Sequence, residues 1–552
     1  MYTLTRKPLS RYERLLSVVT MVRPGEGTSV ARLSLLVFML MTASYLLKPV
    51  RDTLILSQQS AEIRSYLVAL TAGLLILIIP VYGALYRRYL ERESKCLVLR
   101  GVAAFFTVTL AGFIAASLAG LQIAVAFFVW YGVFAVMMLA QFWAFAADLF
   151  NVKSGQRLFV AFAVAASLGA WFGAQLAEGL FSTVGATGLM TLAAVLIGLS
   201  PAVAAIVEPK VPEASRSVPY EEEQLAQPTL LGGFSVLATN RYLIAIAVFM
   251  VLLNWVNSTG EFILASYVKR AAAAVPVADQ EAFMAAFYGD YLAWVTLIGL
   301  AVQLFLVSRI FSVVGVRGAL LILPSVMLLG YGLMWFVPVL SVIRLAAIFE
   351  NSVNYSIQNT TTQALYLPLN RQAKYEGKTI IDTFFWRTGD LIQGGVVFLG
   401  TQVMGVGPEQ FILFNLALSL VFLMVAVGIG RKHRRVLREN VGNVAPQMIS
   451  AIPDVTLPAG QKFSFDISQD TFVDADPGDA LHFRATTDNG APLPRWIRFD
   501  RLEQRFQGIA PNGQYGKLDV SVVVTDFEGL SVSGKFTVEY TDNNDDPVDD
   551  DN

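Results

Sequence analysis

The sequence predicts an all-α polytopic membrane protein, with twelve transmembrane helices in two six-helix halves, followed by an all-β sandwich. The chain has 552 residues, of which 55% are hydrophobic and only 15% are charged. Its mean hydropathy of +0.56 is too high for a soluble globule of this size. Twelve apolar segments recur along residues 29–430, and short alternating segments replace them beyond Arg435. Together, the composition and the change of pattern define the fold class.

The first half extends over residues 29–207 and follows a polar leader. Residues 1–28 carry five Lys or Arg residues without a cleavage site, which indicates an uncleaved cytoplasmic leader. Six apolar segments come next, near 29–49, 65–86, 101–119, 121–147, 158–181 and 187–207. Each is long enough to cross about 30 Å of hydrocarbon as a helix.

The second half extends over residues 239–430, after a proline-containing interval at 208–238 that predicts a cytoplasmic linker. Its six segments lie near 239–268, 286–308, 314–336, 338–366, 379–401 and 409–430, and residues 431–448 form a basic joint. The tripeptide Ala-Ser-Tyr of the first segment recurs in the seventh. Parallel repeats of this kind place a substrate site near the midplane between the halves, with alternating access.

The loops alternate between basic and neutral, which tests the topology. Basic residues follow segments two, four, eight, ten and twelve. We therefore expect a protein of the cell membrane with both chain termini on the cytoplasmic side. Two outer stretches break the pattern, 51–64 with Arg51 and Arg64, and 269–284 with Lys269 and Arg270. Because each follows the first segment of a half, we expect these charges to have a function other than topology.

The stretch from Tyr366 to Asp390 carries the densest charge between apolar runs. On a helix, Lys378 and Asp382 are four residues apart and Arg387 and Asp390 three apart, so each pair shares a face. Ionisable groups within a membrane face a water-filled cavity, a partner or a substrate. The alternatives are a solvated helix start for the first pair and an internal pair locking two helices for the second.

This stretch, YLPLN with KYEGKTIID and RTGDLIQGG, resembles the second-half signature of the ATP:ADP antiporter family, a distant branch of the major facilitator superfamily. The first helix, with Lys48, Arg51 and the following Asp52, is also similar to that family. The resemblance implies that Lys48, Arg51, Lys378 and Arg387 bind the phosphates of a nucleotide. For Lys48 and Arg51, the alternative is snorkelling at the membrane rim.

Further polar residues in the apolar segments are candidates for gates and for a cavity lining. Lys48 and Asp52 are four residues apart, and Pro49 between them would kink or end the helix. Asp148 with Arg157 would form a first-half gate pair, or be two unrelated rim charges. Gly169 and Gly173 are four residues apart, and this spacing predicts close packing of their helix against another one.

The segment 344–363 is the most polar of the set, and it places Glu350, Asn354 and Gln358 on one helical face. Such a face lines an aqueous path or joins helices. Other charged candidates inside the apolar segments are Glu178, Glu261, Asp290 and Arg344.

Residues 449–541 alternate polar and apolar side chains between turns, which predicts the β-sandwich, and residues 542–552 form an acidic tail. The motifs DADPGD, LPRWIRFD and VTDFEG resemble a dystroglycan-type cadherin-like domain. In relatives of that family, carboxylates at strand ends hold calcium, and here these would be Asp474, Asp476, Asp479 and Asp526. The alternative is a solvated β-domain that binds a protein partner.

Composition excludes several classes of chemistry. One cysteine and two histidines form no metal motif, so zinc hydrolysis and Ser-His-Asp catalysis are not expected. We expect a transporter in a lipid bilayer, not an enzyme, with an anionic small-molecule substrate, no nucleic-acid partner and no cofactor except calcium in the β-domain. Three functions stay open. They are nucleotide exchange, transport of another anionic solute such as an organic phosphate or a cell-wall fragment, and a non-transporting sensor or scaffold.

Overall fold

A computed structural model describes residues 26–85, 95–150, 152–207, 230–369, 373–440, 444–468, 470–474, 481–501, 503–511, 516–526 and 529–541. The chain forms two compact units. The first contains most of the helical chain, and the second contains the β-domain with residues 308–319, 368–370 and 430 onward. The predicted leader up to residue 25, most of the linker and the acidic tail lie outside the described residues.

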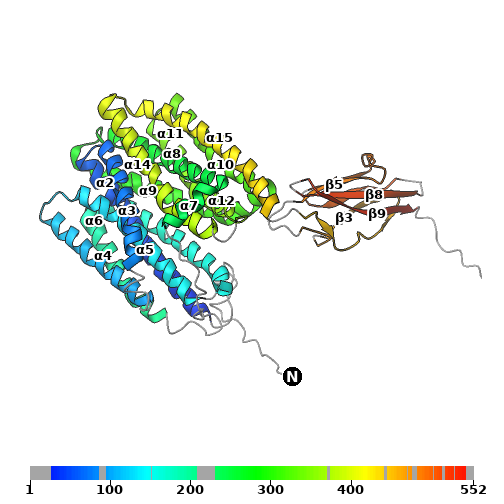
Figure 1. The fold of residues 1–552 in the computed structure, drawn as a ribbon, viewed down its shortest axis with the longest axis horizontal. Helices are drawn as coiled ribbons and strands as arrows, with labels where there is room; N and C mark the ends of the chain where they lie inside the picture. The colour runs from blue at the N-terminus through cyan, green and yellow to red at the C-terminus, as the bar shows by residue number, and fades with distance from the viewer. Residues whose placement is uncertain are drawn as a thin grey trace, which may run out of the picture. The chain divides into compact units, whose positions relative to one another are not determined.

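The first half consists of long apolar helices (Figure 1). They are α2 (Gly27–Gln58), α3 (Ala61–Leu85), α4 (Lys95–Leu118), α5 (Ala124–Leu149) and α6 (Val152–Val207). With 56 residues, α6 is too long for one span, and Gly185, at φ 69° and ψ −175°, breaks it into two. We expected Pro49 either to kink or to end the helix. It does not end α2, because the helix continues for nine residues beyond it to Gln58.

The second half contains four long helices and two composite spans. Its long helices are α8 (Arg241–Ala272), α9 (Gln280–Phe305), α10 (Val307–Phe336) and α15 (Pro408–Asn440), and α7 (Leu230–Thr239) and η4 (Val277–Asp279) lie outside them. One composite span joins α11 (Leu340–Val353), η5 (Asn354–Gln358) and α12 (Asn359–Leu365). The other joins η6 (Ala373–Gly377), α13 (Lys378–Ile380), η7 (Ile381–Phe385), α14 (Trp386–Phe398) and η8 (Leu399–Val403). The last part of the predicted linker is therefore helical, as α7.

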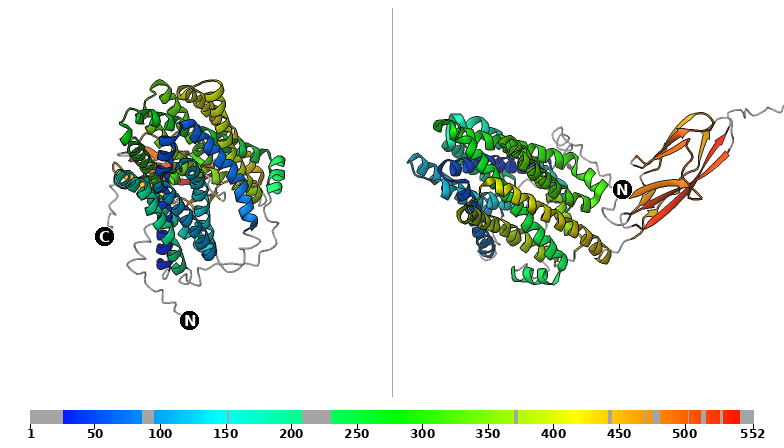
Figure 2. Two further views of the ribbon diagram at one scale, coloured as in Figure 1. Left: turned by 90° about the vertical axis from the view of Figure 1, so that its left-hand side faces the viewer. Right: turned by 90° about the horizontal axis from the view of Figure 1, so that it is seen from above.

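The twelve-span prediction is confirmed. Nine helices in the described part of the chain are long and apolar enough to span a membrane. The break at Gly185 divides one of them, and the two composite spans complete the set. Their interruptions are π-helical, with one extra residue in the turn. The two halves lie side by side, the first in blue to cyan and the second in green to yellow (Figure 2).

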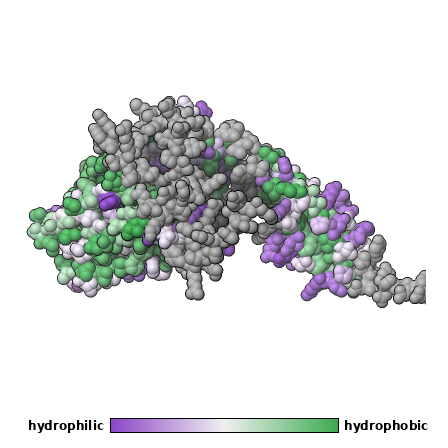
Figure 3. Space-filling view, turned by 90° about the horizontal axis from the view of Figure 1, so that it is seen from below, coloured by the Kyte–Doolittle hydropathy of each residue, from purple (hydrophilic) through white to green (hydrophobic). Residues whose placement is uncertain are grey.

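The surface of the helical bundle suits a hydrocarbon environment. Large apolar side chains such as Leu77, Val108 and Leu329 are 66%, 71% and 74% exposed. Hydrophobic residues dominate the visible face of the helices, whereas the β-domain is largely hydrophilic (Figure 3). Apolar side chains at such exposure are expected where lipid covers the protein.

Within the first half, α2 packs more closely on α6 than on any other helix. A Cβ atom at Gly169 would lie 2.5 Å from the carbonyl oxygen of Phe38, and one at Gly173 would lie 2.5 Å from that of Thr42. The hydroxyl of Thr42 donates to the carbonyl of Gly169 at 3.2 Å. The two glycines therefore serve helix packing, as their spacing predicted.

Of the helix pairs that join the halves, α6 with α9 and α3 with α14 have the most extensive contacts. A Cβ atom at Gly394 of α14 would lie 2.6 Å from that of Ala69 in α3, and one at Gly289 of α9 would lie 2.8 Å from the backbone nitrogen of Glu178 in α6. The halves thus approach each other at backbone distance, which requires glycine on one side of each contact.

The β-domain is the predicted sandwich. Its main sheets have the strand orders β2-β9-β8-β5 and β3-β7-β6, and β1 pairs with β4. The strands are β1 (Gln447–Met448), β2 (Val455–Pro458), β3 (Lys462–Asp466), β4 (Phe472–Val473), β5 (His482–Thr487), β6 (Ile497–Asp500), β7 (Arg505–Ile509), β8 (Gly516–Thr525) and β9 (Ser531–Thr541). Phe506, Val520, Val522 and Val538 are fully buried in its core. Gly460 and Gly490, both at positive φ, lie in predicted turns.

The packing of α2 on α6 predicts the effect of a single methyl group. The Gly173→Ala variant should be destabilised by about 1–3 kcal/mol, because its Cβ must displace the backbone of α2. Gly179→Ala is the matched control, since a Cβ atom on Gly179 of the same helix meets no atom within 4 Å. Denaturation of the purified protein in mild detergent measures both. Equal stability of the two variants would contradict the close packing.

Candidate functional site

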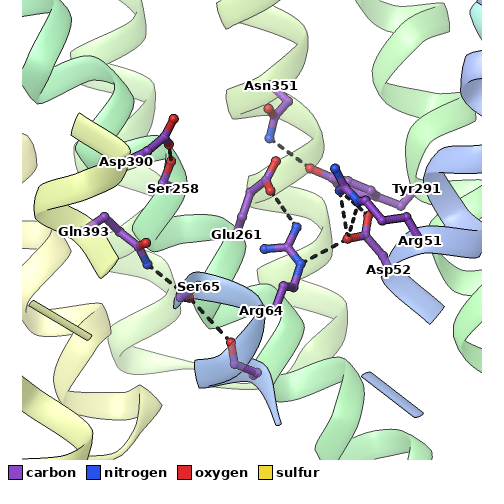
Figure 4. A network of polar contacts seen from close by, with 11 residues as sticks. Arg51, Asp52, Arg64, Ser65, Ser258, Glu261, Tyr291, Asn351, Asp390 and Gln393 are labelled. Atoms are coloured by element: carbon purple, nitrogen blue, oxygen red, sulfur yellow. Dashed lines mark hydrogen bonds and ion pairs between the residues drawn. The ribbon is translucent and has the colours of Figure 1, made fainter. Parts of the chain in front are cut away.

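A chain of charged side chains links the two halves (Figure 4). Asp52 of α2 accepts hydrogen bonds from Nε and Nη2 of its neighbour Arg51, with Nη2 at 2.8 Å from each carboxylate oxygen. Arg64 of α3 places Nε 3.1 Å from Asp52 and Nη2 2.7 Å from Glu261 of α8. Arg64 therefore bridges one carboxylate in each half.

The four side chains of this charged chain, Arg51, Asp52, Arg64 and Glu261, have no net charge, and they are largely buried. They are two guanidinium groups and two carboxylates, and the side chains of Arg64 and Asp52 are only 4% and 2% exposed. Removing charges from water is costly unless each has a partner in good geometry, and the loss of one partner leaves an uncompensated charge. The arrangement therefore holds together as a unit, and Glu261, at 27% exposure, is its most accessible member.

Further hydrogen bonds join the halves near the same end of the bundle, where α2 ends and α3 begins. Ser65 of α3 receives a hydrogen bond from Gln393 of α14 at 3.3 Å, and the hydroxyls of Tyr66 and Thr401 lie 3.3 Å apart. Lys269, at the end of α8, donates to the carbonyl of Gln59. We call this region the α2–α3 end, and the two halves are held together there.

Lys48 of α2 differs from the other predicted cations. Within the described part of the chain, no carboxylate lies within ion-pair distance of its ammonium group, which lies 5.6 Å from the centre of the Tyr45 ring. The predicted Lys48–Asp52 pair does not form, because Arg51 and Arg64 occupy the carboxylate of Asp52. Lys48 is thus a positive charge available to a ligand.

Aromatic rings surround these cations. The Arg51 guanidinium lies 4.7 Å from the centre of the Phe128 ring and 4.9 Å from that of Tyr131. Tyr355, in η5 of the second half, is within electrostatic range of Arg51, Tyr131 and Glu261 and yet is 45% exposed. A side chain that is so placed between the halves and still exposed faces solvent-accessible space. Rings and cations together can hold a planar, negatively charged ligand.

The second-half cations are both paired as predicted. Lys378 lies 3.1 Å from Asp382, with both side chains about one-third exposed. Arg387 lies 3.7 Å from Asp390, whose carboxylate also accepts from Ser258 of α8 at 2.5 Å. Asn254 of α8 donates to the carbonyl of Trp386 at 2.8 Å. The Arg387–Asp390 pair therefore contributes to the contact between α14 and α8, while Arg387 itself stays 23% exposed.

Glu350, Asn354 and Gln358 do not form one exposed polar face. All three are buried, at 4%, 7% and 1% exposure. The segment Asn354–Gln358 is π-helical, so the extra residue in the turn changes the fourfold spacing that an α-helix would keep. Glu350 accepts a hydrogen bond from Tyr331 of α10 at 2.8 Å, and Gln358 donates to Thr362 at 3.1 Å. Their burial and the bond of Glu350 to α10 favour the joining of helices over the lining of an open path.

The remaining predicted residues are placed only in part. Arg157 lies 2.9 Å from Glu26, whereas the side chain of Asp148 lies outside the described residues. In the β-domain, Asp476 and Asp479 also lie outside them. Asp526 accepts from the backbone of Gly529 and Leu530 at 2.6 and 2.8 Å, which stabilises the turn between β8 and β9. The described residues contain no group of three metal-ligating side chains.

Sequence reasoning noticed Arg64 and Glu261 separately but missed their contact. Arg64 was one of the charges that broke the topology rule, and Glu261 was one of several intramembrane carboxylates. The two residues are 197 positions apart in the chain. The only sequence signals for this pair are a basic residue in the stretch after the first segment and a carboxylate inside the seventh, which is the first segment of the other half.

Comparison with solved structures shows the fold. A mutant of the nucleoside transporter NupG covers 73% of this chain and 99% of its own, at 16% identity and a TM-score of 0.52. An auto-inhibited POT family peptide transporter and the POT family transporter PepTSo each have a TM-score of 0.50, at 10% and 12% identity, and cover 73% of this chain. They cover 97% and 98% of their own chains. The bundle has the fold of these transporters.

The β-domain has a sequence match of its own. Residues 445–541 match the family described as "Putative Ig domain", so the domain is an Ig-like sandwich. No curated protein matches the sequence. The resemblances to the ATP:ADP antiporter family and to cadherin-like domains stay predictions.

The ion pairs of Arg64 should keep the α2–α3 end closed. The Arg64→Ala variant should label a Ser65→Cys reporter about tenfold faster or more, because the loss of a buried ion pair costs well over the 1.4 kcal/mol that equals a factor of ten. Ser65 is 1% exposed in the closed arrangement. Cys96→Ser removes the one native cysteine, and a membrane-impermeant thiol reagent measures the rate.

Arg270→Ala is the control for this measurement. Arg270 forms an ion pair with Glu409 at the same end, but both residues belong to the second half. Its loss should leave the labelling rate unchanged. Equal rates for the Arg64→Ala and Arg270→Ala variants would show that Arg64 does not hold the halves together.

Proposed function

We propose that this chain moves a small anionic solute across a membrane by alternating access. The observation that carries the proposal is Lys48, a cation without a carboxylate partner among the described residues, next to the inter-half charged chain and beside aromatic rings. An anion bound by Lys48 would lie beside Arg51 and near Glu261, so its arrival would change the forces on the Arg64 bridge. Binding and the movement of the halves are thereby connected.

Nucleotides are the first substrate class to test, and exchange of ATP for ADP is the form that the sequence resemblance implies. Lys48 and Arg51 would hold phosphate oxygens through charge-assisted hydrogen bonds. Tyr131, Phe128 and Tyr355 offer ring faces on which a planar base can stack. Lys378 and Arg387, from the second half, would bind the same ligand as the halves rearrange.

A less highly charged solute is the second candidate, because three of the four predicted cations are already neutralised. Arg51, Lys378 and Arg387 each have a carboxylate partner. A polyphosphate would have to compete with these carboxylates, whereas a solute with one anionic group, such as an organic phosphate or a cell-wall fragment, needs only Lys48 and a share of one arginine. Two residues favour the same candidate, because they differ from what the resemblance to the nucleotide exchangers implies. Asp390 stands where those proteins more usually carry a lysine, and Pro49 between Lys48 and Arg51 is not expected of them.

Several accompanying properties belong to this proposal. The chain would carry out no chemical step, and both termini would lie in the cytoplasm, as its basic loops indicate. The β-domain would bind a protein partner or, through Asp474 and the neighbouring Asp476 and Asp479, calcium. A sensor or scaffold without transport is the competing reading of the same fold.

Uptake by proteoliposomes tests the proposal. The full chain should take up labelled ATP, ADP or a singly phosphorylated organic anion, and the Lys48→Ala variant should lose about tenfold or more in apparent affinity, because a hydrogen bond to a charged group contributes about 1.5–3 kcal/mol. Arg387→Ala should also cripple uptake. Lys378→Ala should have a smaller effect, since the Lys378–Asp382 pair is exposed to solvent.

The competing functions give different results. Uptake of the singly phosphorylated organic anion, with no uptake of ATP or ADP, would favour the second candidate. An absence of uptake for every anion, with intact folded protein, would favour the sensor. Normal uptake by both the Lys48→Ala and the Arg387→Ala variants would show that the substrate does not bind at this site.

The β-domain should be separable from transport. It has its own buried core around Phe506 and Val522, so the piece from Val444 should fold as a soluble monomer. A chain ended at Val441 should insert and transport as the full chain does. Gel filtration of the isolated domain and uptake by the shortened chain measure these outcomes. Loss of transport at normal membrane levels would show that the domain gates or assembles the transporter.

A further inference from the structure

Glu350 of α11 is a buried acid in an unusual setting. Its side chain is 4% exposed, and the hydroxyl of Tyr331 donates a hydrogen bond to it at 2.8 Å. No Lys, Arg or His side chain of the described residues lies within ion-pair distance of it. Its position, ten residues into the span that begins at Leu340, is about 15 Å from that end of the helix.

The other buried carboxylates that the structure describes in these helices have cationic partners. Asp52 has Arg51 and Arg64, and Asp390 has Arg387. Two half-buried carboxylates also have arginine partners, Glu261 with Arg64 and Asp290 with Arg344, whereas half-buried Glu178 accepts from Gln175. In this part of the chain, Glu350 stands apart as the buried carboxyl without a compensating charge.

The helices around Glu350 present hydroxyl and amide groups and, among the described residues, one nearby charge. Tyr331 comes from α10, Tyr291 from α9 and Asn415 from α15, and Tyr291 accepts a hydrogen bond from Asn351. The charge is that of Glu261 on α8, which repels a second negative charge at Glu350. Arg344, on α11 itself, and Asp290, on α9, are paired with each other.

An ionised carboxylate in such a place is costly, because the side chain is buried from solvent and no cation of the described residues pairs with it. A bound proton removes that cost, and the neutral acid keeps its hydrogen bond with Tyr331. The geometry therefore provides a place where a proton is held inside the membrane-spanning part of the chain.

Glu350 and Tyr331 lie against α8, next to the residue of α8 that belongs to the inter-half charged chain. A Cβ atom on Gly260 of α8 would collide with the hydroxyl of Tyr331 and would lie 3.6 Å from Glu350. Glycine is thus required for Tyr331 to reach Glu350 across α8. The next residue, Glu261, binds Arg64 of the other half. When the α2–α3 end opens and Arg64 withdraws, the charge of Glu261 is no longer neutralised.

We propose that Glu350 is a proton-binding site, and that proton binding there is coupled to the opening of the α2–α3 end and so to solute movement. A proton taken from water on one side of the membrane is released to water on the other, and no bond other than the O–H bond forms or breaks. The coupling follows from linkage, since a proton that favours one arrangement of the halves is bound more tightly by that arrangement. The transport part rests on the proposed function, whereas the proton site itself does not.

Infrared spectroscopy of the purified full chain tests the proton site without any substrate. Protonated carboxylic acids absorb apart from carboxylates, and a protonated band at neutral pH should be present in the natural chain and absent from the Glu350→Gln variant. Glutamine keeps the shape of the side chain and an oxygen that accepts from Tyr331, so the fold should persist. The Glu350→Asp variant should retain a protonated band, which separates loss of the proton from loss of structure.

Glu178→Gln is the matched control. Glu178 is a half-buried carboxylate of α6 that accepts from Gln175 at 3.1 Å, and its replacement removes the same charge from the other half. The protonated band should survive this change. A band that is unaltered by Glu350→Gln, or absent from the natural chain at neutral pH, would overturn the proposal even if transport is found.

Proteoliposomes with a clamped membrane potential test the coupling. With one proton carried per solute, a gradient of one pH unit, or 1.36 kcal/mol, supports about tenfold accumulation. The Glu350→Gln variant should lower that ratio to about one and still equilibrate labelled solute, while Glu178→Gln should leave it at about ten. Accumulation by Glu350→Gln equal to that of the natural chain would overturn the coupling. A missing protonated band, by contrast, would leave the proposed transport function in place.

Discussion

The arrangement of this protein depends on the need to neutralise every buried charge within the protein itself. Hydrocarbon supplies neither water nor counter-ions, so Asp52 is stable only with Arg51 and Arg64, and Arg64 only with Asp52 and Glu261. Because Arg64 shares itself between a carboxylate of α2 and one of α8, this local requirement becomes a contact between the halves. Any ligand that alters the balance near Arg51 must also alter that contact.

Glycine makes the polar contacts possible by bringing backbones together. At Gly394 and Gly289 the halves meet at distances that exclude a side chain, and Gly169 and Gly173 do the same between α2 and α6. The contact of α3 with α14 places Gln393 on Ser65. Tight packing at the α2–α3 end thus sets the geometry in which few polar groups suffice to hold it closed.

The π-helical turns of the second half have a comparable effect on its interior. They interrupt both composite spans, and the turn Asn354–Gln358 leaves Tyr355 exposed between buried Asn354 and Ser356. An extra residue in a turn shifts every later side chain around the helix axis. The interruption therefore separates an aromatic surface, which faces the other half, from the polar groups that join helices around Glu350.

The sequence by itself determined the elements of this protein, because each depends on local composition. Apolar runs of sufficient length predict the spans, and alternation predicts the strands of the sandwich. The spacing of Lys378 with Asp382 and of Arg387 with Asp390 predicts two pairs that are present, since both lie on single helices. Small residues four apart predicted a close helix contact for Gly169 and Gly173, and the structure shows that α2 is the partner.

Only the tertiary structure decided which charge meets which across the chain. Lys48 and Asp52 have the right spacing for a pair, but Arg64 and Arg51 bind Asp52 more closely and leave Lys48 without an ion-pair partner among the described residues. The contacts of Arg64 with Glu261 and of Tyr331 with Glu350 join separate helices, and local spacing carries no information on them. Helix packing determines these partners, because it decides which polar groups share a place from which water is excluded.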